Sequence, residues 1–336
     1  MDSETFVFDA PYPGGLKIVA KRYTQGASST NESGVTLIFT HCIGSHKEQW
    51  EPIIERLFHF QSRKATDVQV REAWGFDWQS HGDSAVVNRE ALKSREDCVS
   101  VFEWWPALVD FVKSPRMEGH KIVALGHSAG AAAVLLTTKG LSMDTNPYRA
   151  IILIEPTVVN REVFQTSIEE RLAEMEFVVS ATSSRKDNWR SKEAAFEYFQ
   201  KRLPWKFWDK RVVRLLSEYG LDDSPGKGVI LKCDKRHEAL SYPDVEPHFE
   251  AAIQIANVGR LVPIHLIWGT RNELVPEYFQ EALCDASAGR IIASVTKVKG
   301  GHFLVQERPD EVADVIAGIL DGLPCKSAGQ VPLSKL

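Results

Sequence analysis

The stretch that decides the fold is Gly126-His127-Ser128-Ala129-Gly130, a G-x-S-x-G pentapeptide. An apolar run, residues 121–125, precedes it, and a run of small and apolar residues, 131–136, follows it. This order predicts a strand, a sharp turn and a helix, which is the context in which G-x-S-x-G exposes a nucleophilic serine. The alternative, a glycine-rich turn with an incidental serine, is disfavoured by these flanks. We therefore expect Ser128 to be a nucleophile beside a helix N-terminus, which favours negative charge.

Strand and helix patterns alternate on both sides of this pentapeptide. Buried-strand patterns occur at residues 35–40, 71–76, 148–154, 263–269 and 290–295. Alternation on this scale predicts an α/β fold with a mostly parallel sheet and helices on both faces.

One long segment interrupts this alternation. Residues 157–262 are rich in charge and in helical patterns, with polar links such as 222–228, and we expect them to form an inserted helical lid. The predicted division is a core made of 1–156 and 263–323, this lid, and a tail at 324–336. The lid carries an aromatic run that either lines a substrate pocket or packs the lid against the core: Tyr198, Phe199, Trp205, Phe207 and Trp208.

Composition excludes several classes of function. The 336 residues are 43% hydrophobic and 25% charged, which is typical of a globular chain, and the net charge of −5 does not indicate nucleic-acid binding. The five cysteines include no C-x-x-C pair, so neither a disulfide framework nor a zinc site is expected. No segment approaches the ~20 apolar residues of a membrane span. We expect no cofactor and no metal.

A serine nucleophile requires a general base within hydrogen-bond reach. In G-x-S-x-G enzymes the order along the chain is serine, acid, histidine. His302 follows the last strand pattern on a Gly-Gly loop, and we expect it to be the base. His81 lies in the turn pattern D-x-x-x-x-G-x-S at residues 77–84, which favours a structural role.

The acid that orients the base is less obvious. The loop after the penultimate strand normally supplies an aspartate in a G-x-x-D pattern, but residues 269–272 end in Asn272. An amide orients an imidazole without stabilising its charge. Glu155 ends the strand after the nucleophile's strand, at the sheet edge where active sites form. We favour Glu155, with Glu273 and Asn272 as alternatives.

The oxyanion formed by attack on an acyl carbonyl needs backbone N–H donors. We expect one donor at Ala129 and the second at Cys42 or Ile43, in the loop after the strand pattern 35–40. Cys42 has no evident base, so we interpret it as a small apolar loop residue rather than as a nucleophile.

Several motifs together resemble one family, the fungal α/β-hydrolases of secondary-metabolite clusters. These motifs are residues 41–50, 76–84, 126–130, 155–156 and 301–302, the lid pieces 231–233 and 237–239, and the final Ser-Lys-Leu. The resemblance spans most of the chain and implies an α/β-hydrolase fold. The family that it resembles includes peroxisomal toxin-biosynthesis hydrolases and the mycophenolic-acid type of acyl-CoA hydrolase. In the latter the acid lies on the strand after the nucleophile, which implies Glu155; a glutamate there, in place of aspartate, is a departure.

The resemblance implies a peroxisomal esterase or thioesterase that acts on a polyketide-like or fatty-acyl intermediate. Ser334-Lys335-Leu336 is the tripeptide read by the peroxisomal import receptor, so that receptor is an expected partner. The substrate is expected to be a small acyl compound, with CoA-linked acyl groups among the candidates, and a homodimer is compatible with the sequence. Two other functions stay open: hydrolysis of an oxygen ester by a carboxylesterase, lipase or lactonase, and a non-hydrolytic cyclase or binding protein.

Overall fold

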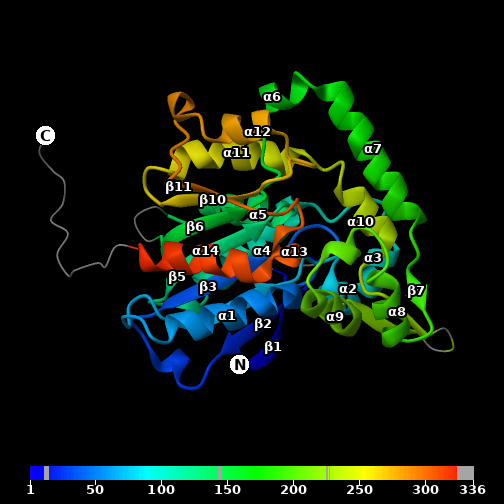
Figure 1. The fold of residues 1–336 in the computed structure, drawn as a ribbon, viewed down its shortest axis with the longest axis horizontal. Helices are drawn as coiled ribbons and strands as arrows, with labels where there is room; N and C mark the ends of the chain where they lie inside the picture. Colours follow the sequence, from blue (N-terminus) through cyan, green and yellow to red (C-terminus); the bar gives the residue numbers. More distant parts are fainter. Residues whose placement is uncertain (11–14, 143–145, 225, 227, 324–336) are drawn as a thin grey trace, which may run out of the picture.

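The computed structural model describes residues 1–10, 15–142, 146–224, 226 and 228–323 (Figure 1). An eight-stranded sheet runs through the middle of the molecule, in the order β1-β2-β4-β3-β5-β6-β10-β11. Its strands are β1 (Asp2–Phe8), β2 (Ile18–Thr24), β3 (Val35–Thr40), β4 (Val70–Phe76), β5 (Lys121–His127), β6 (Tyr148–Ile154), β10 (Ile264–Gly269) and β11 (Ser294–Val298). β2 pairs antiparallel with β1 and β4, and from β4 to β11 all pairs are parallel. The predicted mostly parallel sheet is therefore confirmed.

Two layers of helices cover the sheet because its central strands are apolar on both faces. On β5, Ile122 and Ala124 join one core cluster, and Val123 and Leu125 join the other. The helices outside residues 157–245 are α1 (Glu51–Gln61), α2 (Gly82–Val87), α3 (Arg89–Lys93), α4 (Val101–Lys113), α5 (Ala129–Gly140), α11 (Glu246–Val258), α12 (Glu277–Leu283), α13 (Leu304–Glu307) and α14 (Pro309–Asp321). Helices α4, α5 and α11 cover one face, and α1 and α14 cover the other (Figure 1).

The segment between β6 and α11 forms a separate layer at one side of the molecule (Figure 1). Its elements are α6 (Arg161–Gln165), α7 (Ile168–Ser184), β7 (Asn188–Trp189), α8 (Lys192–Phe199), α9 (Lys210–Tyr219), β8 (Leu221–Ser224), β9 (Gly228–Leu231) and α10 (Lys235–Ser241). It has its own apolar cluster, which includes Trp189, Phe199 and Trp208. Helix α11, by contrast, packs in the main core beside α5. The division at residues 157 and 262 stays a prediction.

Two local expectations differ from the structure. Residues 222–228, expected as a polar link, carry most of β8 and the first residue of β9, in a small antiparallel sheet of order β7-β9-β8. Gly228 permits this close pairing, because it has φ 82° and a Cβ there would lie 2.2 Å from the carbonyl oxygen of Trp189. The strand expected at 290–295 begins later, at Ser294, and Ile292 instead packs against the main core.

The parallel register brings the carboxyl ends of the central strands to one edge. His127 pairs with Ile154 across β5 and β6, so Ser128 and Glu155, the next residues, are neighbours. Ile154 pairs in turn with Ile267 of β10. The sheet therefore gathers at one edge side chains from distant parts of the chain.

Candidate active site

Ser128 occupies a sharp turn between β5 and α5, with φ 56° and ψ −118°. The two glycines of the pentapeptide make this turn possible. A Cβ at Gly126 would lie 2.5 Å from the oxygen of Gly130, and a Cβ at Gly130 would lie 2.5 Å from the oxygen of Thr40. The turn is thus pressed against the end of β3, which presents the serine at the sheet edge.

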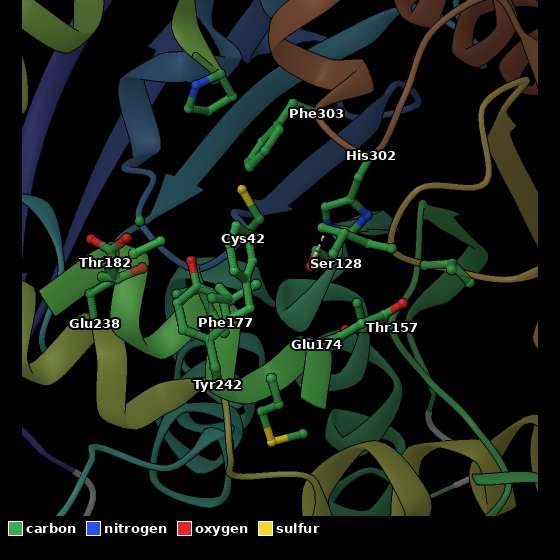
Figure 2. Close-up of a pocket in the computed structure, with 18 of the residues that line it drawn as sticks. Cys42, Ser128, Thr157, Glu174, Phe177, Thr182, Glu238, Tyr242, His302 and Phe303 are labelled. Atoms are coloured by element: carbon green, nitrogen blue, oxygen red, sulfur yellow. Dashed lines mark hydrogen bonds between the residues drawn. The ribbon is translucent and has the colours of Figure 1, made fainter. Parts of the chain in front are cut away.

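Ser128 and His302 are hydrogen bonded. The serine Oγ lies 2.9 Å from Nε2 of His302, and both residues are buried (Figure 2). The carbonyl oxygen of His302 lies 2.8 Å from Nε2 of His127, the residue before the serine. This contact ties the loop of His302 to β5, the strand that leads into Ser128.

Glu155 completes a chain of three side chains. Its Oε2 lies 3.2 Å from Nδ1 of His302, and its Oε1 accepts the N–H of Gly269. With a carboxylate at Nδ1, the ring carries its proton there, which leaves Nε2 free to accept the serine proton. Glu155 has φ 45°, and in the described part of the chain it shares a positive φ among non-glycine residues with Ser128 alone.

The two alternative acids have other partners. Asn272 is exposed, and its Oδ1 accepts a hydrogen bond from Gln280 at 3.1 Å. Glu273 is exposed and pairs with Arg271 at 2.7 Å. The structure therefore brings Glu155, not these residues, to His302.

The expected oxyanion donors lie beside the serine. Ala129 begins α5 directly after Ser128, while Cys42 and Ile43 line the same cavity as Ser128 and His302. Burial raises the pKa of the Cys42 thiol to about 12, and Gln306 Nε2 lies 3.5 Å from its sulfur. A protonated, buried thiol is a poor nucleophile, in agreement with its interpretation as a loop residue.

His81 fixes the loop that carries these donors. Its Nε2 accepts the backbone N–H of Gly44 at 3.0 Å, and its Nδ1 lies 3.0 Å from Ser80 Oγ. Burial holds the pKa of His81 well below its ordinary value, so the ring is neutral and can accept this bond. The structural role expected for His81 therefore includes support of the loop at residues 41–46, which we call the oxyanion loop because it carries two of the expected donors.

Sequence reasoning missed a buried charge cluster under the same loop. The ammonium of Lys47 lies 2.8 Å from Asp77, 2.6 Å from Asp83 and 3.0 Å from Glu48, and its side chain is fully buried. Lys232, which follows β9, also pairs with Asp83, at 2.6 Å. The residues around Lys47-Glu48 in the sequence are themselves polar, so no local signal indicated that this lysine is buried.

A cavity of about 890 Å³ opens over Ser128 and His302 (Figure 2). Its lining is mainly apolar and comes from α7, the turn after α8, α10, α12 and the loops at the sheet edge. Of the aromatic run, Tyr198, Trp205 and Trp208 line this cavity, whereas Phe199 is buried in the lid's own cluster. The remaining member, Phe207, is 60% exposed.

The described residues include neither a metal-binding group nor a membrane-spanning helix. No cluster of three or more His, Cys, Asp or Glu side chains in that part of the chain is placed to hold a metal ion. None of its helices is both long and apolar enough to cross a bilayer.

Comparisons with known proteins give one family. The model of the "Alpha/beta hydrolase family" matches residues 37–315. No curated protein matches the sequence.

Solved structures match over nearly the whole chain at low identity. The peroxisomal alpha-beta-hydrolase Lpx1 of Saccharomyces cerevisiae has a TM-score of 0.73 at 20% identity, over 99% of this chain and 93% of its own. E-2-(acetamidomethylene)succinate hydrolase has a TM-score of 0.68 at 17% identity, over 96% and 100%. The thioesterase domain of the curacin biosynthetic pathway has a TM-score of 0.64 at 13% identity, over 95% and 99%. At these identities, the likeness shows the fold alone.

Proposed function

The chain belongs to the alpha/beta hydrolase family, and on that premise we propose that it is a serine hydrolase that cleaves an acyl thioester through an acyl-enzyme on Ser128. The observation that carries the proposal is the hydrogen-bonded chain Ser128–His302–Glu155, with contacts of 2.9 and 3.2 Å. It lies at the floor of a cavity that is large enough for an acyl chain.

The proposed reaction has two halves. His302 Nε2 takes the proton of Ser128 while Oγ attacks the acyl carbonyl carbon, and Glu155 stabilises the imidazolium that forms. The N–H groups of Ala129 and of Cys42 or Ile43 bind the oxyanion, each worth about 3 kcal/mol in comparable sites. Collapse of the intermediate expels the thiol, which takes the proton from His302. Water, deprotonated by His302, then attacks the carbonyl carbon of the acyl-enzyme. The bond from that carbon to Ser128 Oγ breaks, Oγ takes the proton back from His302, and the carboxylic acid leaves.

Three features support hydrolysis of a hydrophobic acyl compound. The mainly apolar lining suits a polyketide-like or fatty-acyl chain. The motif resemblance to acyl-CoA hydrolases favours a thioester, with coenzyme A as the carrier. The carboxylate of Glu155 beside His302 supplies the charge that Asn272 lacks, which favours hydrolysis over a non-hydrolytic binding role.

The test compares matched substrates. Purified protein is given the same acyl groups as CoA thioesters and as oxygen esters, and the release of free thiol and of free acid is followed. We expect thioester cleavage by the wild type and none by Ser128→Ala, while Ser183→Ala, which changes an exposed lid serine, stays active. Cleavage of oxygen esters alone would favour a carboxylesterase. Fluorophosphonate labelling that persists in Ser128→Ala would overturn the role of this serine.

We further propose that the enzyme works in the peroxisome. Ser334, Lys335 and Leu336, which motivate this proposal, lie outside the described residues. A fluorescent protein fused to residues 324–336, with and without Leu336, tests it; a cytosolic signal from the intact tail would contradict import. Dimerisation also stays a prediction, which light scattering of the purified chain can measure.

A further inference from the structure

The charge of the cavity is concentrated in one turn of the lid. Among the residues that the structure describes, seven side chains of the Lys, Arg, Asp and Glu types line the cavity, five basic and two acidic. Both acidic ones are already paired: Glu174 lies 2.8 Å from Arg171, and Glu238 accepts from Nη1 of Arg185 at 2.6 Å. The three remaining cations are Lys201, Arg202 and Lys206. In a chain of net charge −5, such an excess of positive charge in one cavity calls for an anionic ligand.

All three of these cations are exposed. In the part of the chain that the structure describes, none of Lys201, Arg202 and Lys206 forms an ion pair. Arg202 does lie over the ring of Tyr198, at 5.6 Å, and Lys186 lies over the same ring at 5.6 Å. The ring of Tyr198, which also lines the cavity, therefore contacts one of the three cations by a cation–π interaction, and this contact leaves the N–H groups of Arg202 without a carboxylate among the described residues.

Backbone hydrogen bonds and one ring contact fix the conformation of the turn at residues 201–206, which presents the cations. The N–H of Lys206 donates to the oxygen of Arg202 at 2.8 Å, and Lys201 donates to the oxygen of Tyr198 at 3.2 Å. Trp205, inside the turn, packs on Phe199, with ring centroids 4.8 Å apart. A fixed backbone lowers the entropy cost of gathering the three charges around a ligand.

Two contacts between aromatic rings lead from Trp208, just after this turn, to His302, the proposed base. The rings of Trp208 and Phe303 lie 5.6 Å apart, and those of Phe303 and His302 also lie 5.6 Å apart. Phe303 stands next to His302 in Figure 2. A substrate that spans the cavity can thus place a carbonyl at Ser128 and an anionic group at the turn.

We propose that Lys201, Arg202 and Lys206 form a subsite for the phosphate groups of the thiol carrier, which orients the substrate with its leaving group toward the lid turn. This subsite rests on the proposed thioesterase function. It assigns the acyl chain to the apolar part of the cavity and the phosphorylated nucleotide of the carrier to the 201–206 turn. Phosphates suit it because lysine and arginine bind them through charge and several N–H donors.

The experiment compares one acyl group on two carriers. Acyl-CoA carries the phosphorylated nucleotide, and the acyl-pantetheine thioester lacks it. In the variant Lys201→Gln/Arg202→Gln/Lys206→Gln, we expect the KM for acyl-CoA to rise roughly tenfold relative to the KM for acyl-pantetheine, as the loss of three exposed ion pairs would give. The matched control Arg63→Gln/Lys113→Gln/Arg260→Gln removes three exposed cations outside the cavity and should leave this ratio unchanged.

Salt and direct binding give two further readouts. Sodium chloride should raise the wild-type KM for acyl-CoA more than that for acyl-pantetheine, because screening weakens exposed charge contacts. Calorimetric titration with adenosine 3′,5′-bisphosphate should show binding to the wild type that the triple variant loses. An unchanged KM ratio together with equal nucleotide binding would overturn the subsite. If the wild type shows neither fluorophosphonate labelling nor thioester cleavage, the proposed function is contradicted. The nucleotide-binding measurement would still decide whether the subsite exists.

Discussion

Oε2 of Glu155 lies 3.2 Å from Nδ1 of His302, although the two residues are 147 positions apart in the chain. The contact exists because β6 is next to both β5 and β10 in the sheet. An acid at the end of β6 can therefore replace one in the loop after β10, where Asn272 is found.

Replacement of Glu155 by glutamine should lower kcat by about 10⁴-fold, because an amide can select the wrong tautomer of His302 and cannot stabilise the imidazolium. Asn272→Ala should change kcat by no more than about threefold, since its side chain is exposed and bonded to Gln280. Steady-state kinetics on one thioester measure both, with thermal melts to show that each variant is folded. A larger loss in Asn272→Ala would assign the acid to the other loop.

Gly44→Ala should lower kcat by roughly 10²-fold through displacement of the oxyanion loop. Gly44 has φ 75°, and a Cβ there would lie 2.6 Å from Oε1 of Glu238. The matched control is Gly26→Ala, which has φ 55° but nothing within 4 Å of the added Cβ. Both variants should lose about 1 kcal/mol of stability to the left-handed backbone, and the first alone should lose activity. Equal kcat values in the two variants would show that the backbone conformation at Gly44 does not affect catalysis.

Lys47→Met should reduce the free energy of unfolding by about 3–5 kcal/mol, because it leaves buried carboxylates without their cation. Asp77 and Glu48, both buried, would lose contacts of 2.8 and 3.0 Å. The control Lys64→Met breaks a half-exposed pair with Asp321 and should cost less than about 1 kcal/mol. Urea denaturation compares the two variants. Similar small losses in both would show that the cluster does not stabilise the fold.

Stability should fall as the pH falls from about 6.5 toward 4, since burial lowers the pKa of several histidines. The pKa of His248 is lowered to about 4, and those of His41 and His127 to about 3. In this window the unfolded chain, with histidine pKa values near 6.5, binds more protons than the folded chain, so acid favours unfolding. His248→Gln removes one titrating group. Between pH 7 and pH 5, its free energy of unfolding should therefore fall by on the order of 2 kcal/mol less than that of the wild type. Parallel pH dependences in the two proteins would contradict this.

The sheet and the turn that carries Ser128 were predictable because their signals are local. The apolar run before Gly126 and the small residues after Gly130 specify a strand, a turn and a helix without any long-range contact. Two features of the sequence indicated that Glu155 would lie beside His302: the amide at Asn272, which lacks the charge of an acid, and the carboxylate at the end of the neighbouring strand. The role of Glu155 as the acid stays a prediction. The order of the parallel strands then placed Ser128 and Glu155 at the same edge of the sheet.

Polar contacts between segments that are far apart in the sequence could not be predicted. The hydrogen bond from Gly44 to His81 depends on how two loops meet, and the sequence indicated only that His81 sits in a turn. The charges around Lys47 come from segments that are far apart in the chain, namely residues 77–83 and, in the lid, Lys232, so no spacing reveals them. The hairpin of β8 and β9 was missed because its turn residues resemble a linker, while its pairing with β7 is a tertiary contact.

The positive φ angles at Ser128 and Glu155 have a consequence for engineering. Each strained backbone conformation costs about 1–3 kcal/mol, which glycine would largely relieve. A selection for heat resistance alone would therefore favour glycine at the two positions on which the proposed chemistry depends. Libraries that are screened for stability in this scaffold should hold both residues fixed, because the most heat-resistant members would otherwise be the inactive ones.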